Sequence, residues 1–256
     1  MRIAVAGATG RIGRLTITAL EGAGHQTVPL SRATGLDAYT GGGLADALLG
    51  ADALVDVTNN PSQVRAEIVD FFGTVTKNLL AAEEKAGVRH HVLLSIVGLD
   101  HDTRAPHYAG KREQERLVAD GPVPWSIVRA TQFHDFAAMV AGWMEKDGAA
   151  TIAPLLVQPI AHEDVAAILA DVAAGPALGA RLDIAGPETQ DLVDMARRTL
   201  AARGQDIRLI PTWRGPFGPD MAGEVLLPGE GAKLGPTTFD DWLAAGAPVT
   251  GNTAGR

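Results

Sequence analysis

The chain has 256 residues, of which 46% are hydrophobic and 20% charged, and its formal net charge is −8. This composition is that of a folded globular protein and excludes a disordered chain. The acidic balance argues against nucleic acid and anionic membrane surfaces as partners, because both repel negative charge. No stretch approaches the roughly 20 apolar residues that span a bilayer, and the absence of cysteine excludes disulfides and thiol chemistry. We therefore expect a cytoplasmic protein in which any redox chemistry needs a bound cofactor.

Short apolar runs alternate with longer segments of helical spacing through the first half of the chain. The predicted strands are residues 3–6, 26–30, 53–57, 91–96 and 125–129, and the predicted helices are residues 11–21, 43–49, 63–86 and 111–119. This alternation predicts an α/β, Rossmann-type fold, with a doubly wound parallel sheet covered by helices on both faces.

The regular alternation weakens after residue 129, where prolines interrupt it. Residues 161–174 and 190–203 still have helical spacing. We expect a single domain over residues 1–256, with a cofactor core at about 1–130 and a small C-terminal substrate-binding region, with pocket and cap segments, at about 131–249.

A glycine turn is the strongest local motif. It has the spacing G-x-x-G-x-x-G and lies between the first strand and the first helix, with the sequence Gly7-Ala8-Thr9-Gly10-Arg11-Ile12-Gly13. Glycines at this spacing let the backbone turn tightly and bring N–H groups against a pyrophosphate, while the helix N-terminus adds partial positive charge. The turn predicts dinucleotide binding through its residues, above all Gly7, Thr9, Gly10, Arg11, Ile12 and Gly13.

The spacing of this turn resembles that of extended and atypical short-chain dehydrogenase/reductases. Further segments are similar, in order, to the atypical NmrA-like NAD(P)-binding group: Leu94-Ser95-Ile96-Val97-Gly98, Tyr108-Ala109-Gly110-Lys111, Trp125-Ser126-Ile127-Val128-Arg129-Ala130-Thr131-Gln132-Phe133, and His162-Glu163-Asp164-Val165-Ala166. The resemblance covers nearly the whole chain. It implies a Rossmann-type oxidoreductase that uses a nicotinamide cofactor.

The residues after the second predicted strand favour NADP(H) over NAD(H). An NAD-preferring protein places an acid there for the ribose hydroxyls, whereas a 2′-phosphate requires a cation. This chain has Ser31 and Arg32, and no carboxylate before Asp37. Arg32 can form charge-assisted hydrogen bonds with a phosphate, and Ser31 can donate another. The structural alternative is that Arg32 is a solvated loop residue.

Proton donation to a reduced carbonyl points to the start of the fourth predicted helix. Short-chain enzymes use a Tyr and a Lys at i and i+4, but here His107 lies four residues before Lys111 and Tyr108 only three. Either side chain can share a helix face with Lys111. The resemblance implies that Lys111 holds the nicotinamide ribose; the alternative is a solvated lysine paired with Glu115.

Polar residues follow other predicted strands at the edge where ligands bind in such sheets. Ser95 is a candidate for orienting substrate or cofactor, with the alternative that it satisfies a backbone group at the strand end. Thr58 and Asn59 are candidates for contacting the adenosine ribose, with a turn as the alternative, because Asn and Pro are ordinary turn formers. The resemblance implies that Gln132, Phe133 and His134 line the substrate pocket beside the nicotinamide. A packed, neutral histidine is the commoner alternative for His134.

The histidines show no metal-binding pattern, so we expect no metal site. His90 and His91 are adjacent and point to opposite sides of a strand, and no H-E-x-x-H motif is present. The sequence His162-Glu163-Asp164 is best explained as acids that favour a helix N-terminus.

These observations favour an NADP(H)-dependent oxidoreductase that transfers hydride to or from a small carbonyl, quinone or enone. Two alternatives remain: a non-catalytic NADP(H) sensor, favoured by the imperfect Tyr and Lys spacing, and an epimerase or isomerase of the extended short-chain type. The expected partner is a small-molecule substrate. The apolar faces of the helices at residues 63–86 and 111–118 would also support a homodimer.

Overall fold

The computed structural model describes residues 1–101, 105–215 and 217–248. Within this range the chain forms two compact units, residues 1–130 with 162–183, and residues 131–161 with 184 onward. Residues 162–183 lie beyond the expected core boundary near residue 130. They belong to the first unit because helix α6 (His162–Ala174) packs against helix α1 (Arg11–Gly22).

The first unit is built on a parallel sheet. Its strands are β1 (Arg2–Ala6), β2 (Gln26–Leu30), β3 (Ala53–Asp56), β4 (His91–Ile96), β5 (Trp125–Ala130) and the first part of β9 (Arg181–Ala185). The complete seven-stranded sheet has the order β12-β9-β5-β4-β3-β1-β2, with β12 formed by Lys233–Leu234. All five strands predicted in the first half of the chain are confirmed, with boundaries shifted by at most one residue.

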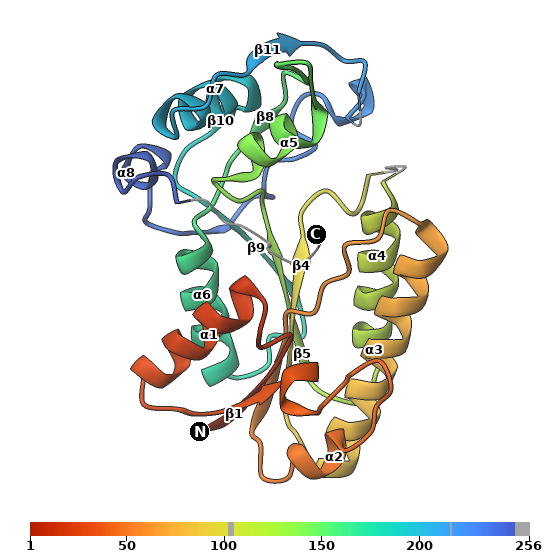
Figure 1. Cartoon of the computed structure of the whole chain (residues 1–256). Coiled ribbons are helices and arrows are strands. Elements are labelled where there is room, and N and C mark those ends of the chain that lie inside the picture. The colour runs from red at the N-terminus through yellow and green to blue at the C-terminus, as the bar shows by residue number, and fades with distance from the viewer. Residues whose placement is uncertain (102–104, 216, 249–256) are drawn as a thin grey trace. The chain divides into compact units, whose positions relative to one another are not determined.

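Helices cover both faces of this sheet, as the Rossmann-type prediction requires (Figure 1). Helices α1 and α6 pack together on one face, whereas α3 (Arg65–Ala86) and α4 (Pro106–Ala119) pack together on the other. The short helix α2 (Leu44–Ala47) packs against α3. Parallel neighbours need such crossover helices, because a hairpin can join only antiparallel strands.

The core of the first unit explains why these residues form these elements. Each of β1, β3 and β4 is almost entirely buried, which is typical of strands covered on both faces. Leu54 of β3 and Leu79 of α3 are fully buried in one cluster with Leu44 of α2. Burying a leucine side chain contributes about 2 kcal/mol, so these contacts fix α2 and α3 on the sheet.

The second unit consists of short elements, because prolines and glycines interrupt its sequence. In chain order they are α5 (Phe136–Met144), β6 (Glu145–Lys146), β7 (Ala149–Ile152), β8 (Leu156–Val157), the end of β9, β10 (Gln190–Asp191), α7 (Leu192–Ala202), β11 (Arg208–Pro211), the 3-10 helix η2 (Pro219–Met221), β12 and α8 (Phe239–Ala244). Strands β6, β7 and β11 form one small sheet, and β8 pairs with β10.

Candidate dinucleotide-binding site

The glycine turn is packed so closely that side chains do not fit at two of its positions. Gly7 follows β1 with a φ of +82°, and a Cβ added there would lie 2.8 Å from the Val57 carbonyl oxygen. A Cβ added at Gly13 would lie only 2.2 Å from the Gly7 carbonyl oxygen. Helix α1 therefore begins directly against the turn, as a cradle for a diphosphate requires.

The start of α1 is suited to an anion. Its N-cap is Gly10, which offers no side-chain hydrogen bond, and its first turn contains no acidic residue. N–H groups in the first turn of a helix have no partner within the helix, and the helix dipole favours negative charge beside them. Ile12 is buried under this turn, while the Thr9 carbonyl accepts a hydrogen bond from Arg14. The residues present thus fit the diphosphate that the motif predicts.

Ser31 and Arg32 lie beside the turn because Gly7 N–H donates a 3.2 Å hydrogen bond to the Leu30 carbonyl at the end of β2. Ser31 is buried, and its hydroxyl accepts a hydrogen bond from the Thr34 N–H, which caps the 3-10 helix η1 (Arg32–Thr34). Arg32 is exposed and makes no ion pair with any described residue. Its guanidinium is therefore available to a phosphate, and the 2′-phosphate contact stays a prediction.

Thr58 follows β3 and is tied back to Asp56. The Asp56 carboxylate accepts hydrogen bonds from the Thr58 N–H (2.9 Å) and hydroxyl (2.7 Å), and both residues are buried. Asn59 is exposed. Sequence reasoning missed Asp56, although a carboxylate that closes the apolar run Ala53-Leu54-Val55 was a visible signal. The adenosine-ribose contacts expected of Thr58 and Asn59 stay predictions.

Lys111 is buried in the first unit rather than solvated, which excludes the solvated-lysine alternative. Its Nζ donates 2.8 Å hydrogen bonds to the Leu94 carbonyl and to Gln114 Oε1, and it lies 4.6 Å from the centre of the Phe72 ring. Burial lowers the pKa of Lys111 to about 8, while the charges of Asp56 and Glu115 oppose that shift. Gln114 was missed by sequence reasoning. The predicted contact of Lys111 with a nicotinamide ribose is not tested and stays a prediction.

His107 and Tyr108 lie in the first turn of α4, behind Pro106. Burial lowers the pKa of His107 to about 4, and the charge of Lys111 adds to this effect. Burial also raises the pKa of Tyr108 to about 12. At neutral pH the imidazole is therefore uncharged and the phenol keeps its proton, so Tyr108 can donate a hydrogen bond to a developing oxyanion.

We expect His107 to remain neutral throughout the range pH 5–8. The reason is that its ring is packed edge-on against Phe72, at 5.6 Å between ring centres, beside the Lys111 ammonium. Long-range ¹⁵N–¹H NMR spectra should show the neutral imidazole pattern over this range, with the resonance assigned through His107→Phe. A titration midpoint above pH 5 would contradict the prediction.

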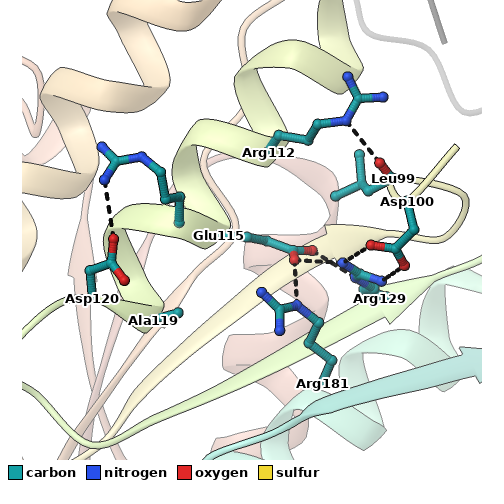
Figure 2. A pocket seen from close by; sticks show the side chains of 9 residues that line it. Leu99, Asp100, Arg112, Glu115, Ala119, Asp120, Arg129 and Arg181 are labelled. Carbon is teal, nitrogen blue, oxygen red and sulfur yellow. Dashed lines mark hydrogen bonds and ion pairs between the residues drawn. The ribbon is translucent and has the colours of Figure 1, made fainter. Parts of the chain in front are cut away.

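Ser95 is buried and is hydrogen-bonded to a charged cluster that is centred on Glu115 of α4. Its hydroxyl donates a 2.6 Å hydrogen bond to Glu115 Oε1. Glu115 also accepts from Arg129 Nη2 (2.8 Å) and Arg181 Nε (2.8 Å), and Arg129 reaches Asp100 (2.6 Å). Figure 2 shows these four charged side chains converging among the residues that line a pocket of about 250 Å³. Ser95 is thus bound to a structural network here, and its role in orienting substrate or cofactor stays a prediction.

The predicted pocket residues Gln132, Phe133 and His134 belong to the second unit. His134 is 1% exposed and lies beside the stacked rings of Phe239 (5.7 Å) and Trp242 (5.8 Å). Its Nε2 lies 3.2 Å from the Thr237 carbonyl. This environment is that of a packed histidine, and the contact of these three residues with substrate is not tested.

His90 and His91 have structural surroundings. His91 Nδ1 lies 2.8 Å from the buried carboxylate of Glu83, whereas His90 Nε2 lies 2.8 Å from the Ser126 hydroxyl, so the two side chains have separate partners. Within the described residues, no group of three His, Asp or Glu side chains is placed to hold a metal ion. Glu163 and Asp164 lie in the first turn of α6, which confirms their assignment to a helix N-terminus.

Comparison with known families identifies the chain. Residues 7–176, which include the glycine turn and Lys111, match the family described as NAD(P)H-binding. The protein belongs to the NAD(P)H-binding family. This membership confirms the resemblance to atypical short-chain dehydrogenase/reductases that the order of the motifs indicates.

One curated relative is the (4-alkanoyl-5-oxo-2,5-dihydrofuran-3-yl)methyl phosphate reductase of Streptomyces griseus subsp. griseus. It is 33% identical over 144 residues, which cover 51% of this chain and 48% of the relative. The match therefore spans about half of that protein's length.

Solved structures confirm the fold of this NAD(P)H-binding chain. A short-chain dehydrogenase/reductase superfamily protein from Agrobacterium tumefaciens, with bound NAD, is 19% identical, has a TM-score of 0.72 and is matched over 96% of both chains. An NADPH-dependent quinone oxidoreductase from Escherichia coli, in complex with NADPH, is 20% identical with a TM-score of 0.65, over 82% of this chain and 78% of that one.

Among the helices of the described residues, none combines the length and apolar character that crossing a bilayer demands.

Proposed function

We propose that the protein is an NADPH-dependent oxidoreductase that reduces a small carbonyl, quinone or enone. The observation that carries the proposal is the glycine turn, where Cβ atoms at Gly7 and Gly13 would meet backbone oxygens at 2.8 and 2.2 Å. Such close approach leaves backbone N–H groups at the start of α1 directed at an anionic diphosphate. Bound NADPH would supply the hydride, and the chain would hold and orient it.

The preference for NADPH rests on the end of β2. Arg32 is the cation that follows this strand, and it is exposed without an ion pair to a described residue. Guanidinium groups bind phosphates through paired, charge-assisted hydrogen bonds. The absence of a carboxylate between Leu30 and Asp37 removes the group that would select NAD(H).

The names of the relatives support a reductase. The Streptomyces griseus relative is named as a reductase of an oxo-dihydrofuran phosphate, and the Escherichia coli structure is an NADPH-dependent quinone oxidoreductase. For this chain, Tyr108 is the candidate proton donor, since its phenol is protonated at neutral pH, although burial raises its pKa to about 12 and so weakens it as an acid.

Steady-state loss of NADPH absorbance against a panel of quinones, enones and ketones tests the proposal. Turnover with at least one acceptor class is the expected result. Tight NADPH binding without turnover on the panel would instead favour a cofactor sensor, an alternative supported by the enclosure of Lys111 by Leu94 and Gln114. Net product formation without NADPH consumption would favour an epimerase or isomerase.

Replacing Arg32 with aspartate should weaken NADPH binding at least tenfold, because a charged hydrogen-bonded pair contributes about 1.5–3 kcal/mol. NADH binding should be retained or improved, since the new carboxylate can accept from the ribose hydroxyls. Isothermal titration calorimetry with both coenzymes measures the change in preference. Arg208→Asp, at another exposed arginine, is the matched control. An unchanged NADPH affinity in the Arg32 variant would refute the phosphate assignment.

A further inference from the structure

The ammonium of Lys111 is buried within its own unit. An ammonium group has three N–H donors. Two are used in the 2.8 Å hydrogen bonds to the Leu94 carbonyl and Gln114 Oε1, while the Phe72 ring lies 4.6 Å away. Lys111 is 5% exposed, so it has little surface left for a further ligand.

A chain of hydrogen bonds runs from Lys111 through Gln114 to the carboxylate of Asp56, which is fully buried. Its Oδ1 accepts from the Thr58 N–H and hydroxyl, and its Oδ2 accepts a 2.8 Å hydrogen bond from Gln114 Nε2. No cation of the described residues forms an ion pair with it directly. A buried carboxylate is costly without a compensating charge, and the charge that reaches it through Gln114 is that of Lys111.

Gln114 is therefore an oriented bridge between two buried charges. Its amide N–H₂ faces the carboxylate and its amide oxygen faces the ammonium. Reversing the amide would set an N–H group against the ammonium and an oxygen against the carboxylate. The two charges thus fix the amide, and the amide transmits the position of one charge to the other.

The bridge ends at the dinucleotide site. Thr58, held by Asp56, is directly preceded by Val57, whose carbonyl oxygen would lie 2.8 Å from a Cβ at Gly7. The end of β3 therefore packs directly against the glycine turn. A displaced Asp56 carboxylate would move the backbone at residues 57–58 and with it the wall of the turn.

We infer that Lys111, Gln114 and Asp56 form a positioning relay for the dinucleotide site, in which Lys111 acts through Gln114 and Asp56 on the β3 end instead of binding the nicotinamide ribose. The inference rests on the proposed function, because NADPH is the ligand that the relay positions. Lys111 is then a positioning residue, and its partners explain why a buried lysine occupies this helix position.

A charge-removal cycle tests the relay, with NADPH dissociation constants measured by calorimetry on wild type, Lys111→Met, Asp56→Asn and the double variant. Each single variant should weaken binding at least tenfold, because it leaves one buried charge without its counterpart. In the double variant neither Lys111 nor Asp56 contributes a charge, and Gln114 can reverse its amide to accept from the amide group that replaces the carboxylate. We expect its affinity to return to within threefold of wild type.

If Lys111 instead contacts the nicotinamide ribose directly, the double variant should bind NADPH no better than Lys111→Met does. That result would overturn the inference. Lys85→Met, at an exposed lysine of α3, is the matched control. Urea unfolding of each variant separates lost binding from lost folding.

Gln114→Met provides a second test if a charge variant does not fold. The relay predicts that this variant also weakens NADPH binding at least tenfold, although Lys111 is retained, and unchanged affinity would overturn the relay. Wild-type protein that binds neither NADPH nor NADH would overturn the proposed function and the inference together. Wild-type binding without rescue in the double variant would overturn the inference alone.

Discussion

Gly13→Ala is expected to lower NADPH affinity at least a hundredfold, a loss of about 3 kcal/mol. The added Cβ would lie 2.2 Å from the Gly7 carbonyl oxygen and 2.9 Å from the Ala8 Cα. Both are backbone atoms, so relief requires the turn or the start of α1 to move. Either movement displaces the N–H groups proposed to hold the diphosphate.

The stability of this variant discriminates between two opposing effects. Alanine is favoured over glycine inside a helix by about 1 kcal/mol, whereas overpacking costs about 1–3 kcal/mol. A backbone oxygen cannot move aside as a flexible side chain does. We therefore expect the overpacking to outweigh the gain in helix propensity, so that the urea midpoint of Gly13→Ala falls.

Gly22→Ala, at the end of the same helix, is the matched control. Apart from its chain neighbours and the backbone of its own helix, nothing lies within 4 Å of a Cβ added there, so it should keep NADPH affinity and gain about 0.5–1 kcal/mol of stability. Calorimetry and urea unfolding measure both variants. Normal NADPH affinity in Gly13→Ala would show that the turn does not bind the diphosphate.

Glu115→Gln is expected to cause the largest loss of stability. Glu115 is 3% exposed and accepts hydrogen bonds from Arg129, Arg181 and Ser95. Removing one partner of a buried ion pair typically costs about 3–5 kcal/mol. We expect about 3 kcal/mol, the lower end of that range, because the Arg181 side chain is 44% exposed and so already partly solvated.

The pH dependence of unfolding gives an independent check. Burial by itself would raise the pKa of Glu115, but the hydrogen bonds from Arg129, Ser95 and Arg181 hold that pKa below its ordinary value of 4.5. The stabilisation is therefore complete above pH 4.5 and is lost as pH falls through the lower folded-state pKa. The difference in unfolding free energy between wild type and Glu115→Gln should shrink in that acidic window.

Glu113→Gln provides the control for Glu115. Glu113 pairs with Arg116, whose side chain is 55% exposed, and such surface pairs contribute about 0.2–1 kcal/mol. Its effect in urea unfolding at pH 7 should therefore stay below about 1 kcal/mol. Equal losses in the two variants would show that the Glu115 cluster contributes no more than a surface ion pair.

The sequence was sufficient for the elements that a local pattern encodes. Buried apolar runs placed the first five strands, and the glycine spacing placed the turn between β1 and α1. Helical spacing was visible only from Lys111, because the polar residues before it carry little apolar periodicity, although His107 and Tyr108 were correctly placed at the start of α4, which begins at Pro106. The fold class and the family followed from these local signals and from their order along the chain.

Only the tertiary structure decided the partners of the buried polar groups. Gln114 and Asp56 are 58 residues apart in sequence, and Arg181 and Glu115 are 66 apart, yet each pair is joined by a 2.8 Å hydrogen bond. A pattern in the chain fixes which face of a helix is apolar, but it does not fix which charge from another element meets that face. Lys111 and Ser95 were therefore recognised as candidates from sequence, whereas the carboxylates and amides that hold them became visible only when β3, β4 and α4 were packed together.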